Sequence, residues 1–177
     1  MKILLKICTL CAFLLFGSSI YAKERANIYA YSRDVPQKSI IGETGAKVKL
    51  DEFNGDFVMA VFWSRYCVPC IRELKGLSNF VKETKNEGIR VIMISPKNEW
   101  ISGFSEQRQF LKRFEADNLE IYVDEKEALA SALGIFSSPV TILISRDAQE
   151  IGRIRGSVVW DNSDFINYIR KIKADKG

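Results

Sequence analysis

Hydrophobic residues along this chain occur in short blocks, and their spacing alternates between the patterns typical of strands and of helices. Residues 57–61 are apolar throughout, which predicts a strand buried on both faces. Residues 71–87 carry apolar side chains about one helical turn apart, which predicts an amphipathic helix. The apolar positions of this helix are Ile71, Leu74, Leu77 and Val81. A buried strand is therefore followed closely by a helix, and residues 62–70 connect the two.

Strand and helix patterns also alternate along the rest of the chain, where Gly and Asn mark the turns between elements. Residues 23–44 are polar, and we expect them to form a lead-in with one short strand. Further strands are predicted at residues 46–50, 89–94, 119–123, 139–144 and 150–154. Further helices are predicted at residues 106–116 and 125–133, and after an N-cap at Asn162 or Ser163. This order predicts an α/β fold in which one mixed central sheet has helices on both faces.

Two cysteines, Cys67 and Cys70, lie where the buried strand gives way to the helix. A C-x-x-C in this setting is typical of a thioredoxin-like redox motif. Unpaired N–H groups and the helix dipole stabilise a thiolate at a helix start, so we expect a lowered pKa for the Cys67 thiol. Pro69 suits the first helical turn, which needs no N–H from it. Trp63 and Tyr66 are expected to flank the two sulfur atoms with apolar surface and, together with Pro69, to contact the substrate.

A structural bridge and a zinc site are two other possible roles for the cysteine pair. A disulfide across two residues closes a very short loop and removes little chain entropy, so a purely structural bridge would stabilise the fold only slightly. A zinc site would need more ligands than this pair supplies, and the chain has no histidine. The sequence therefore favours a redox-active Cys67–Cys70 disulfide, with no metal and no other cofactor.

Residues 1–22 have the pattern of a targeting segment. A positively charged start precedes an apolar run at residues 7–16, which is too short to span a bilayer comfortably. Small residues follow, and Ala22 is a suitable cleavage point, whereas an uncleaved membrane anchor is the alternative. Two of the four cysteines lie in this segment, so cleavage would leave only Cys67 and Cys70. Export would place that pair in a compartment where a disulfide persists.

The net charge also limits the possible partners. The formal net charge of the whole chain is +4, and two of the lysines belong to the targeting segment. This balance is too close to neutral to imply a nucleic acid or an acidic membrane surface as a partner. The remaining length suits one domain with a hydrophobic core.

Four stretches together resemble a known family. The matching stretches are residues 45–55, 62–70, 134–141 and 156–160. From Gly45 to Arg170 the chain resembles the TlpA-like thiol–disulfide oxidoreductases, the thioredoxin-superfamily group that includes ResA and CcmG. The resemblance implies a thioredoxin-like domain at residues 45–177, preceded by the lead-in at residues 23–44. It also implies a central insertion at residues 95–125.

The resemblance carries implications for the site. In such proteins the proline at the position of Pro139 follows a cis peptide bond and faces the cysteines. The resemblance therefore implies that the Ser138–Pro139 bond is cis. It also implies that the Ser138 backbone pairs with an extended substrate segment. Cys67 would attack a substrate disulfide, and Cys70 would resolve the mixed disulfide. The implied protein is periplasmic or otherwise extracytoplasmic. It would act on disulfides or dithiols of proteins such as apocytochrome c, with a membrane electron donor of the DsbD or CcdA type. We expect a monomer.

Other activities remain open at this point. The same chemistry run in reverse would make the protein an oxidant that inserts disulfides, and the residues between the cysteines do not fix the direction. A peroxidase of the peroxiredoxin type is a further alternative, because Ser64 stands three residues before Cys67. A metal chaperone is disfavoured by the absence of histidine.

The sequence departs from the family pattern at two positions near the motif. Tyr66 replaces the tryptophan that usually precedes the first cysteine, and Lys75 replaces a proline that usually follows the second. Glu73 matches a glutamate that the family often carries, one helical turn after Cys70. Glu73 would accept the proton of Cys70 as that thiol attacks. The alternative is an ordinary solvated glutamate that pairs with Lys75.

Two further pairs of residues are given structural roles. Arg153 and Arg155 are predicted to lie on a solvated strand face. Phe110 and Phe114 lie on one face of a predicted helix and are predicted to belong to the core.

Overall fold

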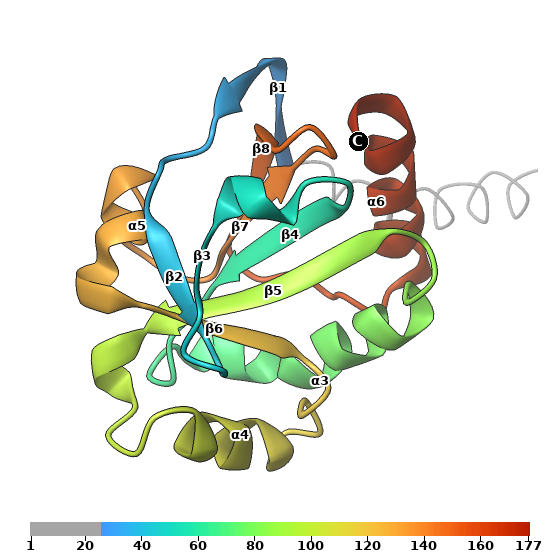
Figure 1. Ribbon diagram of the computed structural model, residues 1–177. Coiled ribbons are helices and arrows are strands. Elements are labelled where there is room, and N and C mark those ends of the chain that lie inside the picture. The colour runs from blue at the N-terminus through green and yellow to red at the C-terminus, as the bar shows by residue number, and fades with distance from the viewer. Residues whose placement is uncertain (1–25) are drawn as a thin grey trace, which may run out of the picture.

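The computed structural model describes residues 26–177, so the predicted targeting segment at residues 1–22 lies outside the described residues. Its centre is one eight-stranded sheet with the order β1-β8-β7-β4-β5-β6-β2-β3 (Figure 1). The strands are β1 (Ala26–Asp34), β2 (Ser39–Gly42), β3 (Lys47–Lys49), β4 (Phe57–Phe62), β5 (Ile89–Pro96), β6 (Glu120–Asp124), β7 (Val140–Ile144) and β8 (Gln149–Arg155). The α-helices are α3 (Val68–Glu83), α4 (Phe104–Lys112), α5 (Ala128–Ala132) and α6 (Ser163–Lys176). Three short 3-10 helices are η1 (Leu50–Phe53), η2 (Lys97–Glu99) and η3 (Glu125–Glu127).

Strand β4 lies in the middle of the sheet, and every one of its residues is buried, as its apolar sequence predicts. It runs parallel to β5 and antiparallel to β7, and β5 runs parallel to β6. The carboxyl ends of β4, β5 and β6 therefore meet at one edge of the sheet. The predicted hairpin at the end of the chain is also present, because β7 and β8 pair antiparallel.

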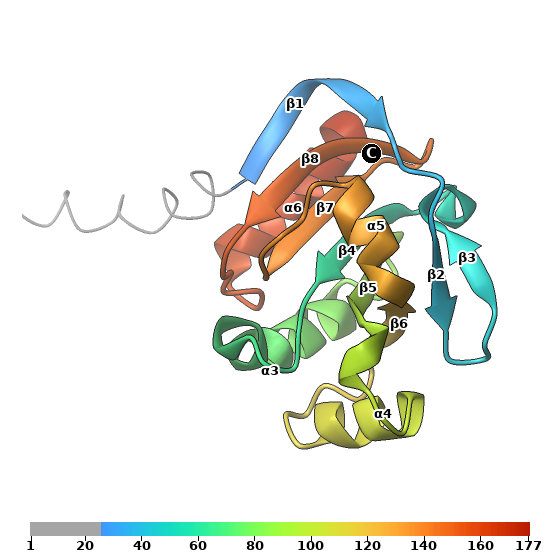
Figure 2. The same ribbon diagram turned by 90° about the vertical axis from the view of Figure 1, so that its left-hand side faces the viewer.

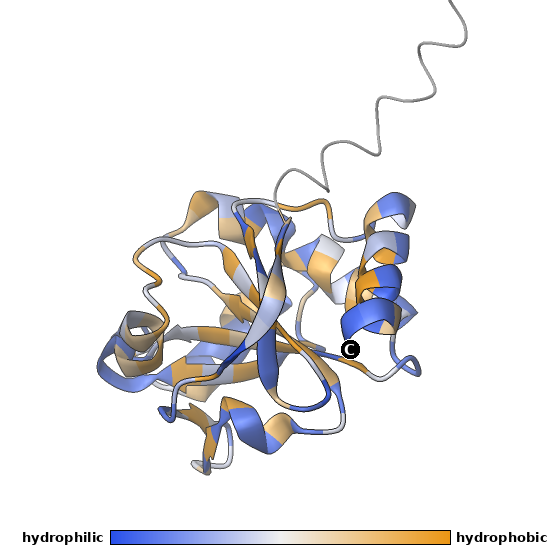
Figure 3. Cartoon of the chain, turned by 90° about the horizontal axis from the view of Figure 1, so that it is seen from above, coloured by the Kyte–Doolittle hydropathy of each residue, from blue (hydrophilic) through white to orange (hydrophobic). Residues whose placement is uncertain are grey.

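The side chains of β4 alternate between two hydrophobic cores. Met59 and Val61 belong to the first core, together with residues of α3, α4 and α6. Val58 and Ala60 belong to the second core, together with residues of η1 and α5. Helices therefore cover both faces of the sheet, as predicted, and Figure 2 shows α5 in front of the sheet with α6 behind it. Figure 3 shows hydrophobic residues concentrated on the central strands, whereas the outer helices alternate between hydrophobic and hydrophilic residues.

The lead-in contains more structure than the sequence predicted. Residues 23–44 were expected to hold one short strand, but the described part of this segment forms both β1 and β2. Strand β1 pairs with β8, and β2 pairs with β3 and β6, so both belong to the central sheet. Most residues of β1 are half-buried or exposed, as befits an edge strand, and this weakens the hydrophobic signal in the sequence.

Helix boundaries differ from the prediction by a few residues. Helix α3 begins at Val68 and ends at Glu83, before the predicted end at residue 87, and Gly88 follows with a φ of 62°. Helix α4 ends at Lys112, before the predicted end at residue 116, and Glu115 then adopts a left-handed conformation with a φ of 55°. In the predicted helix at 125–133, the first three residues form η3 and only α5 is α-helical. The last helix begins as predicted, because the Asn162 side chain accepts hydrogen bonds from two backbone N–H groups of its first turn.

The prediction for Arg153 is wrong. This residue is only 8% exposed, and its guanidinium binds the buried carboxylate of Glu150 and the carbonyl oxygen of Leu133. Arg155 is exposed, as predicted. An internal salt bridge therefore occupies a strand position that the sequence suggested was solvated.

Phe110 and Phe114 both pack against the first core, as predicted, with their ring centroids 5.1 Å apart. None of the helices described between residues 26 and 177 combines the length and the apolar character that a membrane span requires.

Candidate active site

The two cysteines form a disulfide at the start of α3. Cys67 is the N-cap residue, and the backbone N–H of Cys70 donates a hydrogen bond to its sulfur at 3.3 Å. Cys67 is half-buried, whereas Cys70 lies inside the helix and is 3% exposed. The outer sulfur therefore belongs to Cys67, and it occupies the position where helical N–H groups stabilise a negative charge.

The loop before β7 faces this disulfide from the other side. The carbonyl oxygen of Ser138 lies 3.4 Å from the Sγ of Cys67. The Ser138–Pro139 peptide bond is cis, as the family resemblance implies. Pro139 is buried, and its carbonyl oxygen accepts a hydrogen bond from the backbone N–H of Gly156 at 3.0 Å. This loop, anchored to the residue that follows β8, therefore holds the Ser138 backbone directly against the outer sulfur.

The loop that leads into Cys67 is held by a glutamate from η2. The Ser64 hydroxyl donates to one carboxylate oxygen of Glu99 at 2.6 Å, and the backbone N–H of Arg65 donates to the other at 2.8 Å. The backbone N–H of Tyr66 in turn donates to the Ser64 hydroxyl at 3.1 Å. The Glu99 carboxylate thus holds three consecutive residues before Cys67 in place, two of them directly and Tyr66 through the Ser64 hydroxyl.

The guanidinium of Arg65 forms no ion pair with that carboxylate. It donates to the backbone carbonyl of Glu99, forms an ion pair with Glu106 and lies 4.8 Å from the ring centroid of Trp100. The hydrogen bond from Arg65, supported by the backbone N–H of Ser102, holds the pKa of the Glu106 carboxyl below its usual range. The charge of Arg65 is therefore already neutralised by α4.

The expected substrate-contact residues lie at different depths. Tyr66 is 77% exposed and Pro69 is also exposed, so both reach the surface beside the cysteines. Trp63 is 2% exposed and packs against Trp100 and Phe110, with ring centroids 5.7 and 6.0 Å away. Trp63 therefore supports the site from below, and only its edge lines the cavity next to the disulfide.

Glu73 is half-buried and fixed by the segment that precedes α6. One carboxylate oxygen accepts the backbone N–H of Val158 at 2.8 Å, and the other accepts the indole N–H of Trp160 at 3.0 Å. Lys75 instead pairs with Glu115 at 2.8 Å. The alternative of a solvated glutamate paired with Lys75 therefore does not describe this residue.

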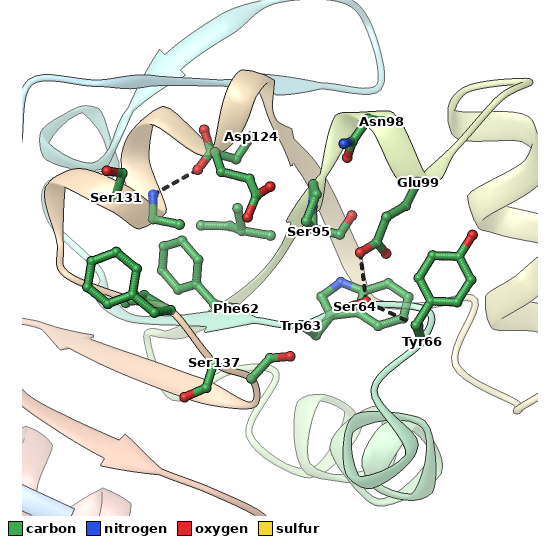
Figure 4. Close-up of a pocket in the computed structure, with 17 residues that line it drawn as sticks. Phe62, Trp63, Ser64, Tyr66, Ser95, Asn98, Glu99, Asp124, Ser131 and Ser137 are labelled. Carbon is green, nitrogen blue, oxygen red and sulfur yellow. Dashed lines mark hydrogen bonds between the residues drawn. The ribbon is translucent and has the colours of Figure 1, made fainter.

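A cavity of about 530 Å³ opens beside the disulfide, at the carboxyl ends of β4, β5 and β6 (Figure 4). Tyr66 and Ser138, which adjoin the outer sulfur on two sides, both line this cavity. No group of three or more acidic or cysteine residues within residues 26–177 is arranged to hold a metal ion.

Sequence analysis missed the residues that orient the site. Glu99 lies 34 residues after Arg65 in the chain, and nothing near it distinguishes it from the other acidic residues of the insertion. Trp160 and Val158 belong to a stretch that matched the family, but their hydrogen bonds to Glu73 span more than 80 positions. Only the folded sheet brings these segments together.

A disulfide at a helix N-cap, a cis-proline loop against its outer sulfur and this sheet order together define a thioredoxin-like thiol–disulfide oxidoreductase. Residues 31–169 match the AhpC/TSA family, and the chain belongs to it.

Curated relatives are similar over most of their length. ResA from Bacillus thuringiensis subsp. konkukian, a thiol-disulfide oxidoreductase, is 23% identical over 170 residues, which cover 96% of this chain and 92% of that protein. ResA from Bacillus subtilis is 22% identical over 138 residues, which cover 77% of this chain and 74% of that protein.

Solved structures share the fold. A thiol:disulfide interchange protein from Bacteroides sp. superposes with a TM-score of 0.65 at 19% identity, covering 82% of this chain and 91% of that one. StoA from Bacillus subtilis gives a TM-score of 0.58 at 16% identity, covering 75% of this chain and 92% of that one. The predicted thioredoxin-like fold is therefore confirmed.

Proposed function

We propose that this protein is exported and reduces disulfide bonds in extracytoplasmic proteins, with Cys67 as the nucleophile and Cys70 as the resolving thiol. The observation that carries this proposal is the asymmetry of the pair. The sulfur of Cys67 lies at the helix start, 3.4 Å from the backbone of Ser138, whereas Cys70 is 3% exposed. A substrate disulfide reaches Cys67 first.

The reaction transfers two electrons from the dithiol to the substrate. The Cys67 thiolate attacks one substrate sulfur, the substrate disulfide breaks, and its other sulfur leaves as a thiolate. The Cys70 thiolate then attacks the Sγ of Cys67, which breaks the mixed disulfide and releases the second substrate thiolate. The substrate is reduced, and Cys67–Cys70 is left oxidised, as it is in this structure.

Glu73 is proposed to accept the proton of Cys70 during the resolving attack. It lies one helical turn after Cys70, and its carboxylate is oriented by Val158 and Trp160. Glu73→Gln should therefore shift the pH dependence of mixed-disulfide resolution, while Cys67 still attacks the substrate disulfide at the wild-type rate.

The cellular setting proposed here rests on the sequence of residues 1–22 and on the relatives named ResA. A cleaved signal or an uncleaved anchor would both place the domain outside the cytoplasm. A membrane donor of the DsbD or CcdA type would return the pair to the dithiol, because that compartment is oxidising. Apocytochrome c is one substrate that fits, and we propose that the protein acts as a monomer.

Trapping of mixed disulfides tests the assignment of the two thiols. Cys70→Ser should accumulate covalent adducts with natural partners in the exporting cell, because the resolving thiol is missing. Cys67→Ser should accumulate few, because Cys70 is shielded. Non-reducing gels followed by mass spectrometry would detect the adducts and identify the substrates. Equal trapping by both variants, or none by Cys70→Ser, contradicts the assignment.

The reduction potential of the Cys67–Cys70 pair tests the direction of electron flow. A value near that of thioredoxin, about −270 mV, is expected for a reductant. A value near that of DsbA, about −120 mV, would instead identify a protein that inserts disulfides.

A thiol peroxidase is the second candidate, favoured by the family match and by Ser64 three residues before Cys67. The Ser64 hydroxyl, however, donates to Glu99 and accepts from the backbone of Tyr66, and Cys67 is bonded to Cys70. Peroxide consumption by the reduced protein, measured beside insulin reduction, separates the two activities.

A further inference from the structure

The cavity beside the disulfide is acidic. Its lining residues are Phe62, Trp63, Ser64, Tyr66, Ile94, Ser95, Pro96, Asn98, Glu99, Asp124, Glu127, Ala130, Ser131, Ile135, Phe136, Ser137 and Ser138. Three of them are carboxylic acids, namely Glu99, Asp124 and Glu127, and none is a lysine or an arginine. We call this space the acidic pocket. In a chain whose net charge is positive, such a segregation of charge favours a cationic ligand.

The carboxylates of the acidic pocket are not neutralised by the protein itself. The oxygens of Glu99 accept from a hydroxyl and a backbone N–H, and those of Asp124 accept from the backbone N–H groups of Leu129 and Ala130. All these donors are uncharged. Among the described residues, neither Glu99 nor Asp124 nor Glu127 takes part in a salt bridge.

Two cations that adjoin lining residues in the sequence are held elsewhere, and a third, Lys126, is exposed and does not line the acidic pocket. The Arg65 guanidinium pairs with Glu106, and the Lys97 ammonium pairs with Glu125 at 2.6 Å. Neither cation lines the acidic pocket. A positive charge that enters the pocket therefore meets carboxylates whose only partners are dipoles, and it does not have to displace an existing ion pair.

A second, independent feature points to a ligand. The indole N–H of Trp63 is buried and has no hydrogen-bond partner. Figure 4 shows the indole nitrogen on the ring edge that faces Ser95 and Glu99, and Trp63 forms part of the wall of the acidic pocket. An unpaired buried donor is costly, and the cost is recovered when a ligand supplies an acceptor. The ligand therefore needs both a positive charge and a hydrogen-bond acceptor.

The position of the acidic pocket relates this ligand to the redox reaction. Ser138, whose carbonyl lies 3.4 Å from the sulfur of Cys67, forms part of the wall, and so does Tyr66, which directly precedes Cys67. A polypeptide whose cysteine reaches Cys67 must place its neighbouring residues within a few ångströms of this wall. A polypeptide also carries both required groups, because each residue has a backbone carbonyl.

We propose that the acidic pocket binds a lysine or arginine side chain of the substrate protein, next in sequence to the cysteine under attack. In this arrangement the Trp63 indole donates to a backbone carbonyl of the same substrate segment. This inference rests on the proposed reduction of protein disulfides and adds a substrate class, namely disulfides flanked by a basic residue.

The test uses two disulfide-bonded peptides that are identical except for one residue beside the first cysteine, Lys in one and Gln in the other. The reduced full-length protein should reduce the Lys peptide with a kcat/KM about threefold to tenfold higher. The ratio should decrease at 1 M salt, where exposed charges are screened within about 3 Å. Glu127→Gln should reduce the ratio about twofold, because one of three carboxylates is lost. The matched control is Asp147→Asn, which removes an exposed carboxylate in the turn between β7 and β8, outside the acidic pocket, and should leave the ratio unchanged.

A second measurement addresses Trp63. In the Cys70→Ser protein trapped with the Lys peptide, the indole proton resonance of Trp63 should move downfield relative to the free protein. Equal rates for the two peptides, or an unmoved resonance, would overturn the pocket assignment and leave the reductase function intact. Failure to reduce either peptide would overturn the proposed function, and the pocket assignment with it.

Discussion

Glu73 connects the redox helix to the segment before α6 with a single carboxylate. Its two hydrogen bonds reach Val158 and Trp160, and the Trp160 side chain is only 1% exposed. The indole N–H of Trp160 therefore has no access to water that would replace this acceptor. Whatever Glu73 does in the reaction, it also satisfies two donors that folding removes from solvent.

Removal of this carboxylate should destabilise the protein. Glu73→Ala leaves both donors unsatisfied, and we expect the free energy of unfolding to fall by about 1–3 kcal/mol, as measured by urea denaturation. Glu73→Gln should lose less, because its amide oxygen still accepts one of the two hydrogen bonds. Lys75→Ala is the control, since Lys75 is exposed and its loss should change stability by less than about 0.5 kcal/mol. A wild-type stability for Glu73→Ala would contradict the structural role.

At the scale of secondary-structure elements, a buried ion pair joins β8 to its neighbours. Arg153 binds both carboxylate oxygens of Glu150 and the carbonyl oxygen of Leu133 at the end of α5. The Tyr29 hydroxyl of β1 donates to the same carboxylate at 2.7 Å. Burial, and then this hydrogen bond to Glu150, raise the pKa of Tyr29. The hydrogen bond of Arg153 to Glu150 raises the pKa of the guanidinium as well.

Breaking this pair from one side should be costly. Arg153→Met leaves Glu150, which is 2% exposed, without its cation, and we expect the free energy of unfolding to fall by about 3–5 kcal/mol. The double variant Glu150→Leu/Arg153→Met should recover part of this loss, because no buried charge remains. Arg155→Met, at an exposed position two residues further on, is the control and should have little effect. If Arg153→Met lost no more unfolding free energy than Arg155→Met, the buried ion pair would not contribute to stability.

At the scale of the whole molecule, ion pairs between distant segments make stability depend on pH. Arg170 of α6 donates two hydrogen bonds to Glu87, which follows α3, at 2.9 and 2.6 Å. The hydrogen bonds from Arg170 are the main reason why the pKa of the Glu87 carboxyl lies below its usual range. The folded state therefore binds fewer protons than the unfolded state near the usual pKa of a glutamate, so the contact stabilises above that pH.

The resulting stability should be lost as the pH falls through the lowered folded-state pKa. We expect the free energy of unfolding to decrease from about pH 5 downward, and Glu87→Gln to show a shallower decrease because it removes one such carboxyl. Urea unfolding at a series of pH values would measure both slopes. The difference between the two proteins should shrink at 1 M salt, because Glu87 and Arg170 are partly exposed. Identical slopes at low salt would argue against a contribution from this pair.

The sequence predicted those features that depend on neighbouring residues. Strand β4 has an unbroken apolar sequence, α6 has its N-cap at Asn162, and the cysteine pair lies where a strand meets a helix. Features that depend on distant partners were missed. Strand β1 has few buried side chains and is recognisable only through its pairing with β8, and Arg153 is buried only because Glu150 and Leu133 surround it.

The candidate site divides in the same way. Cys67, Cys70 and Pro139 stand in recognisable local contexts, whereas the loop before Cys67 is fixed by Glu99 from the insertion. Trp63 belongs to the same motif, yet its depth below the surface follows from the aromatic residues of the insertion, Trp100 and Phe110, which cover it. Local pattern therefore identifies the candidate reacting atoms, and tertiary packing decides which surface they present.

The pairing of β1 with β8 also has a consequence for the order of events during synthesis. Ala26 at the start of β1 lies opposite Ile154 near the end of β8, so the first described strand to leave the ribosome is paired almost last. A nascent chain that stops before β8 leaves β1 without its strand partner and exposes one edge of β7. Completion of the sheet therefore waits for the synthesis of β8, whereas residues 67–70 are synthesised together and their two thiols are neighbours long before the sheet that surrounds them is complete.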